Sequence, residues 1–160
     1  MNDEAKLYLQ RAENELIGAE IFLKISNNPE LQKGQFKLEK DFTFYSLVIG
    51  HSYYCIFYCA KAILIENGVK TESPEIHKKT LEAFEENLVK MGRLDVELLK
   101  IYKKMIVRAE ELLEIFAFEK RKRGEFTYQK LPQANKEPAE ESFNNAEKFF
   151  KNIMAVLNND

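Results

Sequence analysis

The feature that most constrains the fold is an uncharged segment in the first half of the chain. Residues 42–60 are nineteen consecutive residues without Asp, Glu, Lys or Arg, and six residues between 44 and 58 are Phe or Tyr. A segment of this length can span a bilayer. Thr43, Ser46, His51 and Ser52 interrupt it, however, and the sequence offers no second span. These observations favour a helix that is buried on most sides, and no membrane association is expected.

Apolar residues recur at steps of three and four in five segments, which predicts five helices. The predicted helices cover about residues 5–26, 42–67, 73–91, 95–122 and 138–157. Asn2 or Asp3 is expected to cap the first helix, Ser73-Pro74 to begin the third, and Asp95 to cap the fourth. Segments 26–41 and 124–137 contain prolines and are predicted loops. The pattern predicts an all-α protein, an antiparallel up-and-down bundle of four to five helices in one domain, residues 1–160.

The net charge of −2 indicates no global basic field that would attract nucleic acid. The densest local basic run ends the fourth predicted helix, at Lys120, Arg121, Lys122 and Arg123, with Lys130 nearby. Cations at a helix C-terminus can simply stabilise the helix. Alternatively, this cluster contacts the phosphates of RNA or of a nucleotide.

No metal site or cofactor is expected. His51, Cys55 and Cys59 are spaced four apart on one helix face, but the first and last lie about 12 Å apart along the axis and cannot share one ion. Small buried thiols and a hydrogen-bonded core histidine explain them better. Packing or a hydrogen bond near a helix end likewise explains His77. Reduced cysteines favour a cytoplasmic protein, and the polar helix of Met1 to Arg11 indicates no secretory signal.

The order of these elements resembles the HEPN family of small helical proteins. The residues that carry the resemblance are an aromatic-rich helix with Tyr53-Tyr54-Cys55-Ile56-Phe57-Tyr58, the pair His77-Lys78, a long helix that ends in Arg121-x-x-Gly124-Glu125-Phe126, and a final helix with Ala146, Phe149 and Phe150. The resemblance implies a bundle that dimerises. It further implies a metal-independent RNase, often a toxin paired with a small nucleotidyltransferase antitoxin, with an active site of Arg, four to six residues, then His.

One position departs from this pattern. Arg121 matches the arginine of the motif, but Phe126 stands where the histidine is expected, and phenylalanine cannot transfer a proton. Tyr128 matches the tyrosine of the longer form of the motif, and its ordinary pKa near 10 makes it a poor general base. The sequence therefore favours a protein without enzymatic activity over an enzyme, and it identifies no catalytic residues.

Three functional hypotheses remain open. The first is a non-catalytic module that binds RNA or a nucleotide, or pairs with a minimal nucleotidyltransferase. The second is a metal-independent RNase that uses Arg121 and Tyr128, with His77 or His51 recruited across a dimer. The third is a purely structural helical dimer, in which the resemblance allows Tyr128 to be modified by a nucleotidyltransferase partner. A homodimer is expected under all three, because the aromatic residues of the second helix exceed what one small core can bury.

Overall fold

A computed structural model describes residues 1–38, 42–121 and 136–159, and for 114–121 and 159 it describes the backbone alone. Its elements are α1 (Asp3–Ser26), α2 (Pro29–Gly34), α3 (Tyr45–Glu66), α4 (Ile76–Phe84), a π-helical turn η1 (Glu85–Val89), α5 (Val96–Arg121) and α6 (Lys136–Asn159). No strand occurs within those residues, so the all-α prediction is confirmed. The prediction of a single domain over residues 1–160 stays a prediction.

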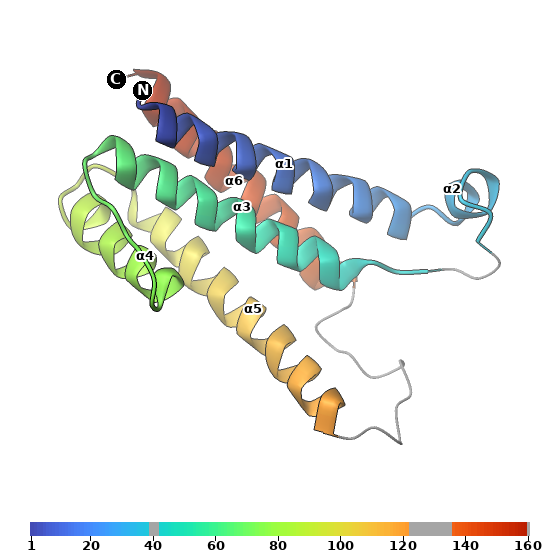
Figure 1. Ribbon diagram of the computed structural model, residues 1–160. Coiled ribbons are helices and arrows are strands. Elements are labelled where there is room, and N and C mark those ends of the chain that lie inside the picture. Colours follow the sequence, from blue (N-terminus) through green and yellow to red (C-terminus); the bar gives the residue numbers. More distant parts are fainter. Residues whose placement is uncertain (39–41, 122–135, 160) are drawn as a thin grey trace.

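The long helices alternate in direction, as predicted for an up-and-down bundle. Figure 1 shows α1 leading away from the N-terminus, α3 returning, α5 leading away again and α6 returning to end beside the N-terminus. Hydrogen bonds fix the two ends of the α1–α3 pair. The backbone N–H of Asn2 donates to Glu66 Oε2 over 2.7 Å, and at the other end the Tyr45 hydroxyl donates to Asn27 Oδ1 over 2.8 Å.

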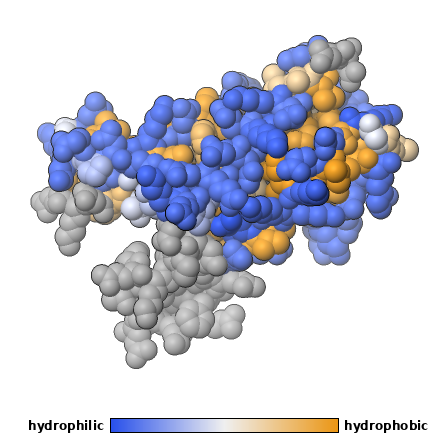
Figure 2. Space-filling view, turned by 180° about the vertical axis from the view of Figure 1, so that it is seen from behind, coloured by the Kyte–Doolittle hydropathy of each residue, from blue (hydrophilic) through white to orange (hydrophobic). Residues whose placement is uncertain are grey.

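The uncharged segment forms the central helix. α3 contacts α1, α4, α5 and α6, and 72% of its most apolar stretch is buried within the bundle. It is the one described helix that is long and apolar enough to cross a membrane. Its burial is that of a core helix: Val48, Ile49, Ile56 and Ile63 are at most 1% exposed. Figure 2 shows the opposite face of the bundle, which is mostly hydrophilic with apolar side chains in separate areas.

The helix starts and stops were predicted with mixed success. The Asn2 side chain caps α1 by accepting from the backbone of Glu4, and Asp95 caps α5 by accepting from the backbone of Glu97 over 2.7 Å. The predicted cap at Ser73-Pro74 was wrong, because α4 begins at Ile76 after Glu75, whose φ of 59° is left-handed. The last helix begins at Lys136, two residues before the predicted start.

The predicted loop at 26–41 contains a short helix. The Asn28 side chain accepts a hydrogen bond from the backbone of Leu31, and Pro29 takes the first position of α2, which is a favoured helix start. Gln32 is buried and holds the following segment in place. Its side-chain amide donates to the backbone oxygens of Ile25 and Phe42 and accepts from the Phe42 N–H over 2.8 Å.

Candidate functional site

The basic run predicted to bind phosphate begins at the end of α5. The backbone of α5 is helical through Lys120 and Arg121, and Figure 1 shows this end of the helix diverging from α3. Lys122, Arg123, Phe126, Tyr128 and Lys130 lie outside the described residues. The structure therefore places the start of the predicted site at the end of one long helix, and the rest of that site stays a prediction.

The described part of the chain has a groove between α3 and α5, which we call the α3–α5 groove. It consists of two adjoining cavities of about 420 Å³ and about 510 Å³ that share Tyr53, Tyr54, Ala109 and Leu113. The first cavity, the Glu15 compartment, is also lined by Glu15, Ser46, Leu47, Gly50, His51 and Leu112. The second, the Glu75 compartment, is also lined by Glu75, His77, Lys78, Leu81, Ile106 and Glu110.

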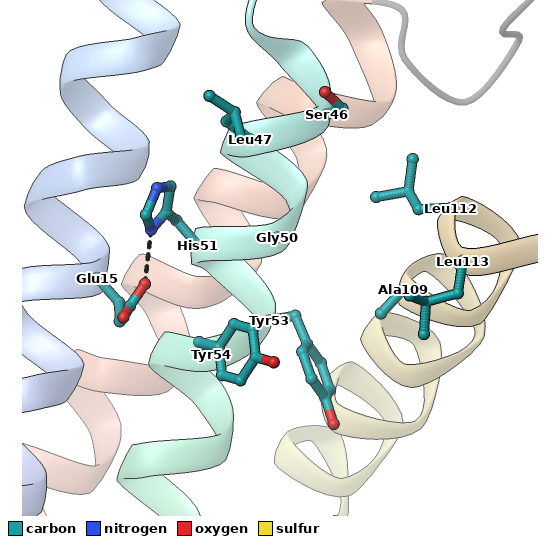
Figure 3. A pocket seen from close by; sticks show the side chains of 10 residues that line it. All are labelled: Glu15, Ser46, Leu47, Gly50, His51, Tyr53, Tyr54, Ala109, Leu112 and Leu113. Carbon is teal, nitrogen blue, oxygen red and sulfur yellow. Dashed lines mark hydrogen bonds and ion pairs between the residues drawn. The ribbon is translucent and has the colours of Figure 1, made fainter. Parts of the chain in front are cut away.

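A histidine and a carboxylate meet at the wall of the Glu15 compartment. His51 Nδ1 lies 2.6 Å from Glu15 Oε2, which joins α3 to α1 (Figure 3). The imidazole also stacks on Phe22, with the ring centroids 5.5 Å apart and the planes 13° apart. The prediction of a hydrogen-bonded histidine is confirmed. The prediction that it lies in the core was wrong, because its side chain is 33% exposed.

The second histidine lies in the Glu75 compartment. The Tyr53 hydroxyl and His77 Nδ1 are 2.7 Å apart, and the Phe57 ring centroid lies 4.3 Å from that of the imidazole. Burial lowers the pKa of His77. Burial, with the neighbouring Tyr54 and Glu110, raises the pKa of Tyr53 to about 12. The phenol therefore keeps its proton near neutral pH and can donate it to Nδ1. The predicted hydrogen bond of His77 near a helix end is confirmed.

The two cysteines take no part in the groove. Cys55 and Cys59 are free thiols and both are 0% exposed. Burial, followed by the contact with Cys55, raises the pKa of Cys59 well above its usual range, so its reactive thiolate form is disfavoured. The described residues contain no group of three His, Cys, Asp or Glu side chains that could hold a metal ion.

The groove runs toward the basic end of α5. Leu113 is the last described α5 residue that lines it, and Arg121 follows eight residues later, about 12 Å farther along the helix axis. Sequence reasoning missed Glu15, because a contact between residues 36 positions apart leaves no local pattern. The Tyr53–His77 pair had a weak signal, since a tyrosine in a buried helix usually finds a hydrogen-bond partner.

Comparison with known proteins identifies the family. The HEPN domain family matches residues 5–156. A protein of Methanocaldococcus jannaschii named "Putative toxin MJ0142" is 37% identical over 55 residues, which cover 34% of this chain and 35% of that protein. No solved structure gives a significant match. Because the family match extends over nearly the whole chain and the helices form the bundle that the resemblance implied, the chain belongs to the HEPN domain family.

Proposed function

We propose that this protein is a toxin-like HEPN module that binds RNA or a nucleotide at the basic end of α5 without cleaving it. The binding groups are Lys120, Arg121, Lys122, Arg123 and Lys130. The observation that carries the proposal is the sequence after Arg121, which keeps the arginine of the family motif and replaces its histidine with Phe126. Guanidinium groups bind phosphate oxygens in pairs, whereas proton transfer needs a titratable group.

The test is a titration of fluorescent single-stranded RNA against the wild type and the double variant Arg121→Ala/Arg123→Ala. Removing two phosphate contacts should weaken binding and reduce the slope of log affinity against log salt by about 1.4. The matched control is Lys6→Ala/Lys24→Ala, which removes two exposed positive charges from α1. Equal affinity of the wild type and the Arg121/Arg123 variant, independent of salt, would refute the proposal.

A metal-independent RNase is the second candidate, and the His51–Glu15 pair favours it. A carboxylate that holds an imidazole in place is a common arrangement for proton transfer, and His51 lines a groove that leads toward Arg121. Purified protein would be incubated with RNA in EDTA between pH 5 and 9. Cleavage that is lost in His51→Ala, while RNA binding is retained, would establish the enzyme. No cleavage by the wild type at any pH would exclude it.

A nucleotidyltransferase partner is part of the proposal. The relative named as a toxin supports a paired system for this chain, and Tyr128 is the residue that such a partner would modify. Co-expression with a minimal nucleotidyltransferase, followed by mass spectrometry, should show added mass on Tyr128. Tyr128→Phe is the matched control and should show none. If the two proteins form a stable complex in which Tyr128 is unmodified, the proposed partner is supported and the proposed modification is refuted.

We further propose a cytoplasmic homodimer. The aromatic residues of α3 now give weaker support than the sequence alone suggested, because Phe57 is buried and Tyr53 and Tyr58 are half-buried within one chain. The family remains the support for self-association. Light scattering at micromolar concentration should give twice the mass of the chain, and a monomer would contradict the proposal. Cell fractionation tests the location.

A further inference from the structure

The α3–α5 groove exposes large apolar side chains around its two cavities. Leu47 is 43% exposed, Tyr54 is 41% exposed and Leu113 is 67% exposed. They come from both walls of the groove, and Figure 3 shows them around the Glu15 compartment. Exposed apolar side chains that surround a hollow are typical of a surface that binds another molecule. The part of the chain that the structure describes leaves this surface open.

The charges in the groove are mostly negative. Three carboxylates line it, those of Glu15, Glu75 and Glu110, against one ammonium group, that of Lys78. Glu15 is paired with His51, whereas Glu75 and Glu110 form no ion pair with any described residue. Phosphate groups would be repelled beside Glu75 and Glu110, because like charges at close range raise the free energy of binding. The Glu75 compartment therefore favours a positively charged occupant over RNA.

The tyrosine rings add a second attraction for a cation. On the neighbouring surface the guanidinium of Arg11 lies 5.5 Å from the ring centroid of Tyr8 and 6.0 Å from that of Tyr58. Tyr54 is the next ring, 6.0 Å from Tyr58, and it lines both compartments of the groove. The face of an aromatic ring attracts Lys and Arg side chains. A cation that enters the groove can thus lie against Tyr54 and beside Glu110.

The size of the groove matches a short helix. Its α5 wall runs over the eight residues from Ile106 to Leu113, about 10 Å along the axis, which corresponds to about two helical turns. Both walls are helices, and a third helix packs well between two others when its apolar side chains recur at three and four. Two turns provide three such positions and space for one or two charged side chains between them.

We propose that the α3–α5 groove binds an amphipathic helix of a protein partner, which inserts a Lys or Arg side chain between Tyr54 and Glu110. Apolar side chains of that helix pack against Leu47 and Leu113. This surface is separate from the basic end of α5, to which phosphate binding was assigned above. The module then has two faces of opposite charge, one for a phosphate ligand and one for a basic peptide.

The probe is a fluorescein-labelled helical peptide with Leu at positions i, i+3 and i+7 and Arg between them, together with a twin in which every Arg is Glu. Fluorescence anisotropy should show binding of the Arg peptide and at least tenfold weaker binding of the Glu peptide. Tyrosine emission should change on binding. The chain has no Trp, and Tyr53 and Tyr54 lie in the groove.

Two variants test the groove, each with a matched control. Glu110→Lys and Leu113→Asp should each lower the affinity for the Arg peptide at least tenfold. Glu13→Lys, on the exposed face of α1, and Val107→Asp, on α5 but not lining the groove, should change affinity less than twofold. Circular dichroism should show that all four variants are folded. Loss of binding in the control variants as well would contradict a site in the groove.

Other occupants give different results, and each overturns the proposal. Single-stranded RNA that displaces the Arg peptide would make the groove part of the nucleic-acid surface. A dimer that dissociates in Leu113→Asp would show that a second copy covers the groove. No rise in the anisotropy of the Arg peptide as the protein is added to about 100 μM, which would nearly saturate a micromolar site, would also refute it. The RNA titration with the Arg121 variant is independent of these outcomes.

Discussion

The two halves of α5 have the same amphipathic period but different surroundings. In the first half, Leu98, Leu99, Tyr102 and Met105 are at most 6% exposed. From the middle of the helix onward, Val107 is 54% exposed and Leu113 is 67% exposed. Figure 1 shows the cause, since α5 lies against α4 at its start and diverges from α3 toward its end. An amphipathic pattern thus predicts a helix, while its partners decide which of its apolar side chains are buried.

The first half of α5 completes the aromatic centre of the core. The Tyr102 ring lies 5.7 Å from Phe84 and 6.0 Å from Phe149, in both cases edge-on. Such pairs stabilise a fold beyond the apolar area that they bury. Near the middle of the helix, Arg108 forms an ion pair with α6, because its Nη2 lies 2.8 Å from Glu141 Oε2. Pairs that are open to water contribute little to stability.

The largest expected effect is that of Tyr102→Ala. Removing a fully buried ring leaves a cavity and should lower the free energy of unfolding by about 3–5 kcal/mol. The comparison variant is Leu113→Ala in the second half, which should change it by less than about 0.5 kcal/mol, because the side chain is mostly exposed. Urea unfolding followed by circular dichroism measures both. Similar losses in the two variants would show that the halves do not differ in the way described.

The fold was largely predictable from the sequence, because helix formation depends on local periodicity. The apolar residues of α5 at steps of three and four are Leu98, Tyr102, Met105, Ala109 and Leu112, continuing to Phe116. Such spacing predicts that all of them are buried; Leu98, Tyr102, Met105 and Leu112 are, whereas Ala109 is half-buried and lines the groove. The apolar period does not predict the partial exposure of Ala109, because the divergence of α5 from α3 depends on contacts between distant segments.

The candidate site was less predictable for the same reason. His51 and His77 were visible in the sequence, but their partners Glu15 and Tyr53 are 36 and 24 residues away. The charge of the groove also arises from three separate elements, which bring Glu15, Glu75 and Glu110 together. Only the folded chain shows that carboxylates from these three elements line one groove beside α5.

A smaller effect is expected from Tyr53→Phe, on the α3 wall that faces the second half of α5. The variant keeps the ring and removes the hydroxyl that bonds His77 Nδ1. One lost hydrogen bond should lower the free energy of unfolding by about 1 kcal/mol. The control is Tyr54→Phe, whose hydroxyl forms no hydrogen bond with a described residue. An equal loss in both variants would indicate that the Tyr53–His77 bond contributes nothing specific.

The effect of the charge of His77 on the free energy of unfolding should be smaller still, because His77 is only half-buried and water screens its charge. Burial lowers the pKa of His77 in the folded chain, so the unfolded chain binds the proton more tightly. The stability contributed by the neutral imidazole is therefore present above its ordinary pKa of about 6.5 and is lost as the pH falls through the folded value. Histidine resonances in an NMR titration should place the pKa of His77 below 6.5. A value above it would contradict the burial argument.

The smallest effect, and one of opposite sign, is expected from Tyr102→Phe. The Tyr102 hydroxyl is buried without a hydrogen-bond partner among the described residues, and burial raises its pKa well above the usual range. A buried hydroxyl without a partner costs free energy, so removing it while keeping the ring should leave stability unchanged or raise it by up to about 1 kcal/mol. Comparison with Tyr102→Ala separates the contribution of the packed ring to stability from that of the hydroxyl. A loss above about 1 kcal/mol in urea unfolding would mean that the hydroxyl is hydrogen-bonded in solution, and that the first half of α5 depends on a polar contact as well as on its apolar face.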